Sequence, residues 1–124
     1  MPEPFEQASR HVREALAPIV ERVVAHHRDT PVDLREPSVP MGVWFTVPDD
    51  EGQPLALVSA HASAVNFLLG KRGFLLFRDT ASHSIESLER WFEDVLDGVL
   101  GGGLKVDGDR ATLTTRSGTI TLAG

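Results

Sequence analysis

The stretch Ala64–Arg78, AVNFLLGKRGFLLFR, decides the fold of this chain because both of its arms are apolar almost throughout. Side chains alternate between the two faces of a strand, so Phe67 and Leu68 point in opposite directions although both are hydrophobic. Gly70 and Gly73 bracket the tip, and glycine tolerates the positive φ that a tight hairpin requires. The segment therefore predicts a hairpin with two apolar faces, each of which requires a cover.

The sequence predicts one amphipathic helix before the first four strands and another after them. Before them, apolar residues recur at helical spacing, which predicts one helix over about 4–27, kinked at Pro18 because proline removes a backbone hydrogen bond. After them, Ser84 is a typical N-cap, and the run of glycines that starts at Gly101 ends the second helix. An apolar stripe and an acidic stripe lie on opposite sides of this second helix.

Short strands fill the rest of the chain, and Pro, Gly and Asp residues mark the turns between them. The last three alternate apolar and polar residues, as an antiparallel sheet with one wet face does. The fold class is therefore α+β, a single domain over residues 1–124 with a mainly antiparallel sheet of about seven strands in the order α-ββββ-α-βββ. The expected strands are at about 42–47, 55–59, 64–69, 74–78, 104–106, 111–115 and 119–122.

The placement of the two helices determines what covers the central hairpin. We expect both helices on the same face, which leaves the other face for a second subunit, a partner or a ligand. The alternative places the helices on opposite faces, and the hairpin is then ordinary core.

Composition limits the class of protein. A hydrophobic fraction of 41% with 24% charged residues is typical of a soluble globular protein. The longest apolar runs stop after about six residues, far short of the ~20 that a membrane helix needs, and the first residues lack the features of a secretory signal. The chain contains no cysteine, which removes disulfides and thiolate chemistry. We therefore expect a cytoplasmic protein that does not contact a membrane.

The net charge of −6 argues against a nucleic-acid partner, because phosphate binding depends on clustered Lys and Arg. The excess of arginine over lysine indicates a GC-rich, bacterial-like coding bias and no particular function. The acidic stripe of the second helix can steer a basic protein partner and raise its association rate. Its residues, which we expect to bind a partner, are Glu86, Glu89, Glu93, Asp94 and Asp97.

The histidines do not form a metal-binding pattern. His26 and His27 are adjacent and point in different directions on a helix, whereas a ligand pair on one face is spaced by a full turn. Asp107 and Asp109 resemble the start of a calcium loop, but Gly118 occupies the position of the bidentate glutamate. We expect no metal and no cofactor.

His61 is the histidine best placed for chemistry, because Ser59 and Ser63 lie beside it and a serine and a base could meet in a cleft. No G-x-S-x-G nucleophile elbow accompanies them, so an ordinary connection is the simpler interpretation. Asn66 is the polar residue of an otherwise apolar strand and requires hydrogen-bond partners or a wet pocket. We therefore predict no catalytic residue.

Two functions from different classes follow. We expect a non-catalytic, acidic protein-interaction domain, chaperone-like or immunity/inhibitor-like, that forms a homodimer; its layout is broadly similar to small secretion-chaperone and immunity-protein folds. The alternative is a small-ligand-binding protein or enzyme with an apolar pocket near Phe67, Phe77 and His61. The residues expected at the interface or in the pocket are Trp44, Phe45, Phe67, Phe74, Phe77, Asn66 and His61.

Overall fold

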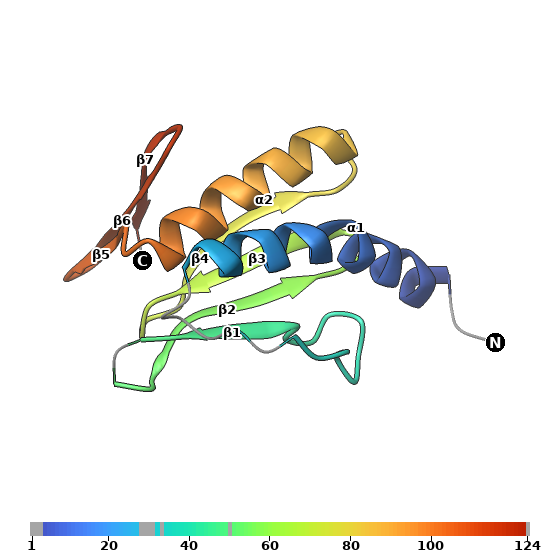
Figure 1. Ribbon diagram of the computed structural model, residues 1–124, viewed down its shortest axis with the longest axis horizontal. Helices are drawn as coiled ribbons and strands as arrows, with labels where there is room; N and C mark the ends of the chain where they lie inside the picture. Colours follow the sequence, from blue (N-terminus) through green and yellow to red (C-terminus); the bar gives the residue numbers. More distant parts are fainter. Residues whose placement is uncertain (1–3, 28–31, 33, 50, 124) are drawn as a thin grey trace.

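The computed structural model describes residues 4–27, 32, 34–49 and 51–123. Its elements follow the order α-ββββ-α-βββ and confirm the α+β class (Figure 1). Their bounds are α1 Pro4–His26, β1 Phe45–Pro48, β2 Pro54–Ala60, β3 Ala64–Leu69, β4 Phe74–Asp79, α2 Ile85–Leu100, β5 Leu104–Asp107, β6 Arg110–Thr115 and β7 Gly118–Ala123.

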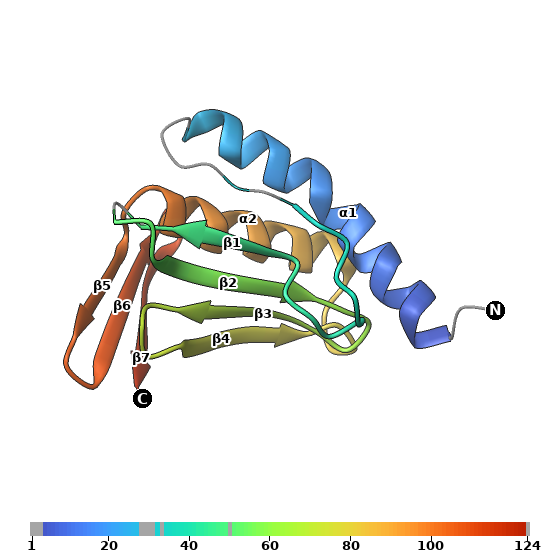
Figure 2. The ribbon, with the colours of Figure 1, turned by 90° about the horizontal axis from the view of Figure 1, so that it is seen from below.

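The first four strands form an antiparallel sheet in the order β1-β2-β3-β4. Figures 1 and 2 show α1 and α2 side by side on one face of this sheet, which is the arrangement we expected. Because side chains alternate across a strand, Val65, Phe67 and Leu69 of β3 all point toward the helices and are fully buried. The opposite face of the sheet carries neither helix.

Aromatic side chains form the centre of the core between the helices and the sheet. Phe67 contacts Trp91 edge to face, with ring centroids 5.7 Å apart, and it lies 5.5 Å from the ring of Phe92. Trp44, which directly precedes β1, has its ring centroid 6.4 Å from that of Phe92. Such aromatic pairs contribute beyond the area that they bury. The core therefore joins α2 directly to the middle of the sheet.

The first helix continues through Pro18 as a single element, as expected. Two buried polar side chains in its N-terminal half form hydrogen bonds with the backbone at the end of β2. The Arg13 guanidinium donates to the Ala60 carbonyl at 3.0 Å and to a Glu36 carboxylate oxygen at 2.8 Å. The Ser9 hydroxyl accepts from the Ala62 backbone N–H at 2.8 Å. These bonds satisfy backbone groups that would otherwise be left unpaired where the helix covers the strand end.

The seven strands are antiparallel as expected, and they are divided between two sheets, the second in the order β5-β6-β7. The connection after α2 holds the start of β5 close to the end of that helix. The N–H of Gly103 returns to the Gly98 carbonyl at 2.8 Å, and the Gly103 carbonyl accepts from Thr114 at 3.0 Å. A Cβ atom at Gly103 would lie 2.3 Å from the Thr114 oxygen, so only glycine fits. The second sheet is thereby held against the C-terminal end of α2.

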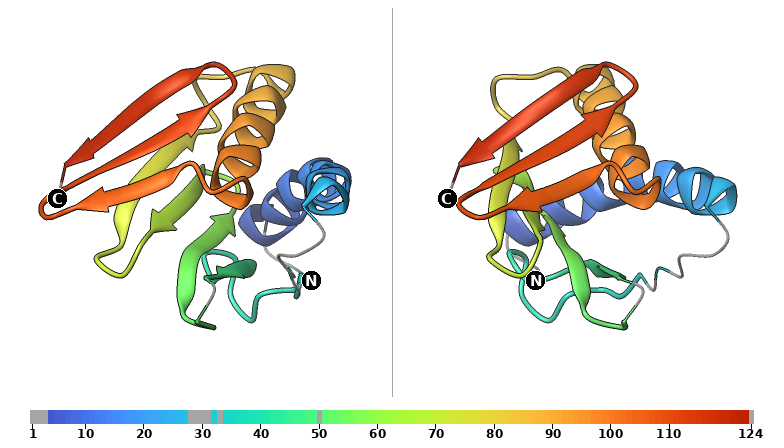
Figure 3. Two further views of the ribbon diagram at one scale, coloured as in Figure 1. Left: turned by 60° about the vertical axis from the view of Figure 1, so that its left-hand side comes forward. Right: turned by 90° about the vertical axis from the view of Figure 1, so that its left-hand side faces the viewer.

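Figure 3 shows the second sheet standing beside the β3–β4 end of the first. An ion pair of 2.8 Å between Arg72 and Asp109 joins the β3–β4 turn to the β5–β6 turn. The apolar side chains expected on one face do share it, since Leu113 faces both Leu104 and Ile120 in the register. Val106 shares this face but is 49% exposed, because it lies on an edge strand beyond the cover of α2.

Neither of the two helices in the described part of the chain is long and apolar enough to cross a membrane.

Candidate functional site

The face of the first sheet opposite the helices is apolar and uncovered. Leu68, Leu75 and Phe77 are 38%, 52% and 54% exposed, although residues of the same strands on the other face are buried. The register places Leu57, Leu68 and Leu75 in one row across three strands. We call this surface, made of the outward residues of β2, β3 and β4, the open face. Large contiguous apolar surfaces of this kind mark interaction sites.

Polar side chains lie at one end of the open face. The next row of the register holds Ser59, Asn66 and Phe77. The Asn66 side-chain amide donates to the Ser59 hydroxyl at 3.3 Å, and the same nitrogen lies 3.3 Å from His61 Nε2. The polar residue that the sequence placed in an apolar strand therefore has partners, and the rest of the open face carries no charged side chain between Leu57 and Phe77.

His61 is almost fully buried, at 4% exposure. The Ser63 backbone N–H donates to its Nδ1 at 3.2 Å. Burial lowers the pKa of His61, and the nearby positive charge of Arg13 lowers that pKa further. Among the described residues no serine hydroxyl is hydrogen-bonded to the ring, because Ser63 contacts it through the backbone. The arrangement stabilises a neutral, structural imidazole.

The structure divides the predicted interface or pocket residues between two faces. Trp44, Phe45, Phe67 and Phe74 are buried on the helix side, whereas Phe77 is on the open face. Phe77 faces Asn66 in the register, and Phe67 faces Leu76, so the two phenylalanines point in opposite directions. One pocket cannot be lined by both. Strict alternation along the hairpin, which the sequence already shows, is the signal that separates them.

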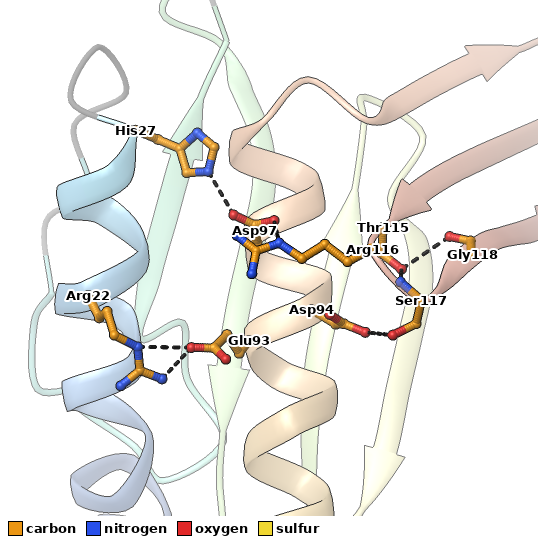
Figure 4. Close-up of polar contacts among 9 residues, drawn as sticks. All are labelled: Arg22, His27, Glu93, Asp94, Asp97, Thr115, Arg116, Ser117 and Gly118. Atoms are coloured by element: carbon orange, nitrogen blue, oxygen red, sulfur yellow. Dashed lines mark hydrogen bonds and ion pairs between the residues drawn. The ribbon is translucent and has the colours of Figure 1, made fainter.

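Two carboxylates of the predicted partner-binding stripe are engaged by α1 (Figure 4). Glu93 accepts from Arg22, whose Nε donates at 2.9 Å. Asp97 lies 2.9 Å from His27 Nε2 and 3.4 Å from Arg116 Nε. These contacts join α2 to the end of α1 and to the β6–β7 turn.

The remaining acids of the stripe differ in their surroundings. Asp94 accepts a hydrogen bond from the Ser117 hydroxyl at the β6–β7 turn. Glu86 is exposed near the start of α2, and Glu89 is half-buried one turn further on. The sequence could not show that Glu93, Asp94 and Asp97 have intramolecular partners, because those partners lie far away along the chain.

The described residues hold no group of three or more His, Cys, Asp or Glu side chains that could bind a metal ion. His26 is exposed at the end of α1, and the ring of His27 contacts Asp97.

Comparison of the chain with family models, with curated proteins and with solved structures finds no match. The open face and its surroundings are therefore interpreted from their own chemistry.

Proposed function

We propose that this protein is a non-catalytic, protein-interaction domain that forms a homodimer by stacking the open faces of two copies. The observation that carries the proposal is the exposure of Leu68, Leu75 and Phe77 on a face of the sheet that neither helix covers. Two sheets pack face to face at a spacing of about 10 Å with interdigitated side chains. A second copy supplies this cover without any further component.

The energetics of this contact are favourable in sign. Burying a half-exposed leucine or phenylalanine contributes roughly 1 kcal/mol at about 25 cal/mol per Å². In a twofold-symmetric interface every such contact is made twice. The gain is opposed by an association cost of several kcal/mol. The apolar contribution therefore acts in favour of association against this cost.

Charges around the open face favour a second copy over an unrelated partner. A twofold axis parallel to the strands and between β2 and β3 places the β1–β2 turn of one copy over the β3–β4 turn of the other. The first turn carries Asp49 and Glu51, and the second carries Lys71. Glu51 and Lys71 are both exposed, so opposite charges meet twice, at the end of the stacked sheets where both turns lie.

Chaperone-like and immunity/inhibitor-like roles remain the two forms of this proposal. The exposed Glu86 and the half-buried Glu89 are the acids of the stripe still available to a basic partner. The proposal includes a cytoplasmic location, with which the absence of cysteine agrees.

The oligomeric state tests the proposal. Light scattering and sedimentation should show a dimer at micromolar concentration, and Leu68→Glu should convert it to a monomer with unchanged circular dichroism, because a charge then lies at the centre of the stacked faces. Ile85→Glu is the matched control, since Ile85 is also exposed but lies on α2. A monomer at high concentration, or a dimer that Leu68→Glu leaves intact, would contradict the proposal.

A further inference from the structure

A second hollow lies on the other side of β4. It is a cleft of about 570 Å³ between β4, α2 and the β6–β7 hairpin. Its apolar lining comes from all three elements: Leu76, Trp91, Val95 and Ile120. This volume is in the range of sites that bind small molecules or short peptides. We call it the edge cleft.

Two arginines make the edge cleft locally positive in an acidic chain. The Arg78 guanidinium lies 5.4 Å from the centre of the Trp91 ring, which holds it by a cation–π contact. Arg90 lines the same cleft from α2. Within the described residues neither arginine has an ion pair, and Asp94, the acid in the lining, already accepts from Ser117. The cleft thus offers two cationic groups to an external carboxylate.

The free edge of the first sheet runs along this cleft. β4 is the last strand of its sheet and pairs only with β3. The Thr80 N–H donates to the Ser63 carbonyl at 2.9 Å, so the backbone groups of Thr80 point toward β3. Along a strand, the N–H and C=O groups of successive residues point to alternate sides. Counting back from Thr80, the backbone groups of Arg78 and Leu76 point toward β3, whereas those of Leu75 and Phe77 point toward the free edge. An edge of this kind is a template for another strand.

We propose that the edge cleft binds an extended, acidic peptide segment of another protein, which adds to β4 as a fifth strand. The backbone of the peptide pairs with Leu75 and Phe77. Alternate side chains of the peptide point toward α2, where apolar ones contact Trp91 and a carboxylate meets Arg78 and Arg90. Main-chain pairing supplies affinity and the arginines supply selectivity, as in other cases of strand addition. The cleft lies on the helix side and at the edge of the sheet, and Phe77, which belongs to the open face, also lines it.

Designed peptides test this site on the intact protein. The probe is a capped, fluorescein-labelled peptide in which glutamate alternates with valine, and its binding is followed by fluorescence polarisation and by Trp91 emission. We expect saturable binding, and about tenfold weaker binding of the counterpart with lysine in place of glutamate. A counterpart N-methylated on alternate residues keeps the charge but cannot pair with a strand, and it should also bind about tenfold more weakly.

Paired variants locate the binding. Arg78→Gln and Arg90→Gln should each weaken binding of the glutamate peptide severalfold, whereas Arg110→Gln, on the far turn of the second sheet, should not. Leu75→Pro removes an N–H that points to the free edge and leaves the ladder with β3 intact, so it should weaken binding more than Leu75→Ala.

Three results would overturn the proposal: equal binding of the lysine peptide, equal binding of the N-methylated peptide, or no binding of any probe. A dimer that Leu75→Pro abolishes and Leu75→Ala preserves, with unchanged peptide binding, would instead assign the edge of β4 to a second copy.

Discussion

Phe67 on β3 and Phe77 on β4 lie on opposite faces of one sheet, because Phe77 faces Asn66 in the register and Phe67 faces Leu76. Phe67 is completely buried beneath α2, and Phe77 is 54% exposed. Two residues of the same type, on adjacent strands of the hairpin, thus have different functions: one maintains the core and the other forms a surface.

Alanine substitution should separate these functions. We expect Phe67→Ala to lower the free energy of unfolding by about 3–5 kcal/mol through the cavity that it leaves. Phe77→Ala should change the stability of the monomer by less than about 1 kcal/mol, because its ring is largely in water. Urea unfolding at low protein concentration measures both. Similar losses for the two variants would show that the open face is covered within the monomer.

The alternation of apolar residues was enough to predict the elements and their order, because each helix and strand has a period of its own. It also required a cover on both faces of the central hairpin. The division of the strands into two sheets was not predictable in this way, since it depends on the tight contact between Gly103 and Thr114. A run of glycines indicates only that a helix ends.

For Gly98, inside α2, we predict that substitution by alanine lowers the stability of the protein, which is the opposite of its usual effect in a helix. Replacing a helical glycine by alanine normally gains about 1 kcal/mol. Here an added Cβ would lie 2.8 Å from the Thr114 carbonyl oxygen and 3.0 Å from the Thr115 methyl group. We therefore expect Gly98→Ala to destabilise the protein by roughly 1–3 kcal/mol as β6 is pushed away.

Thermal unfolding checks this, with Glu89→Ala on the polar side of α2 as the control, expected within about 0.5 kcal/mol of the parent. A stabilised Gly98→Ala variant would mean that the second sheet does not pack on α2 as described.

Arg10 and Arg13 both contact Glu36, and they offer a matched pair of substitutions. Arg10 is an exposed partner at 3.6 Å, whereas Arg13 is buried and also donates to the Ala60 carbonyl. Lysine cannot reproduce the several donors of a guanidinium. We expect Arg13→Lys to cost about 2 kcal/mol and Arg10→Lys less than about 0.5 kcal/mol.

Chemical denaturation of the two variants measures the difference. Equal effects would show that the buried bonds of Arg13 do not fasten α1 to β2.

The candidate site was only partly predictable from sequence. Alternation identified the apolar surface around Phe77, because it depends on local pattern alone. The charged residues were harder, since Glu93 and Asp97 have partners on α1 and the β6–β7 turn that no spacing rule relates to them. The arginines of the edge cleft were missed for the same reason, because Arg78 and Arg90 come together only when β4 packs beside α2.

His61 makes the stability of the fold depend on pH. Its pKa in the folded protein is below the ordinary value of 6.5, because burial and the charge of Arg13 both oppose protonation. The unfolded chain therefore binds a proton more readily, and the stability that the neutral ring provides is complete above about pH 6.5 and is lost as the pH falls toward the folded pKa. We expect His61→Gln to show a smaller loss of stability than the parent between about pH 7.5 and about pH 5.5. Urea midpoints at these two values, for both proteins, decide the question, and parallel pH profiles would mean that His61 remains accessible to protons in the folded state.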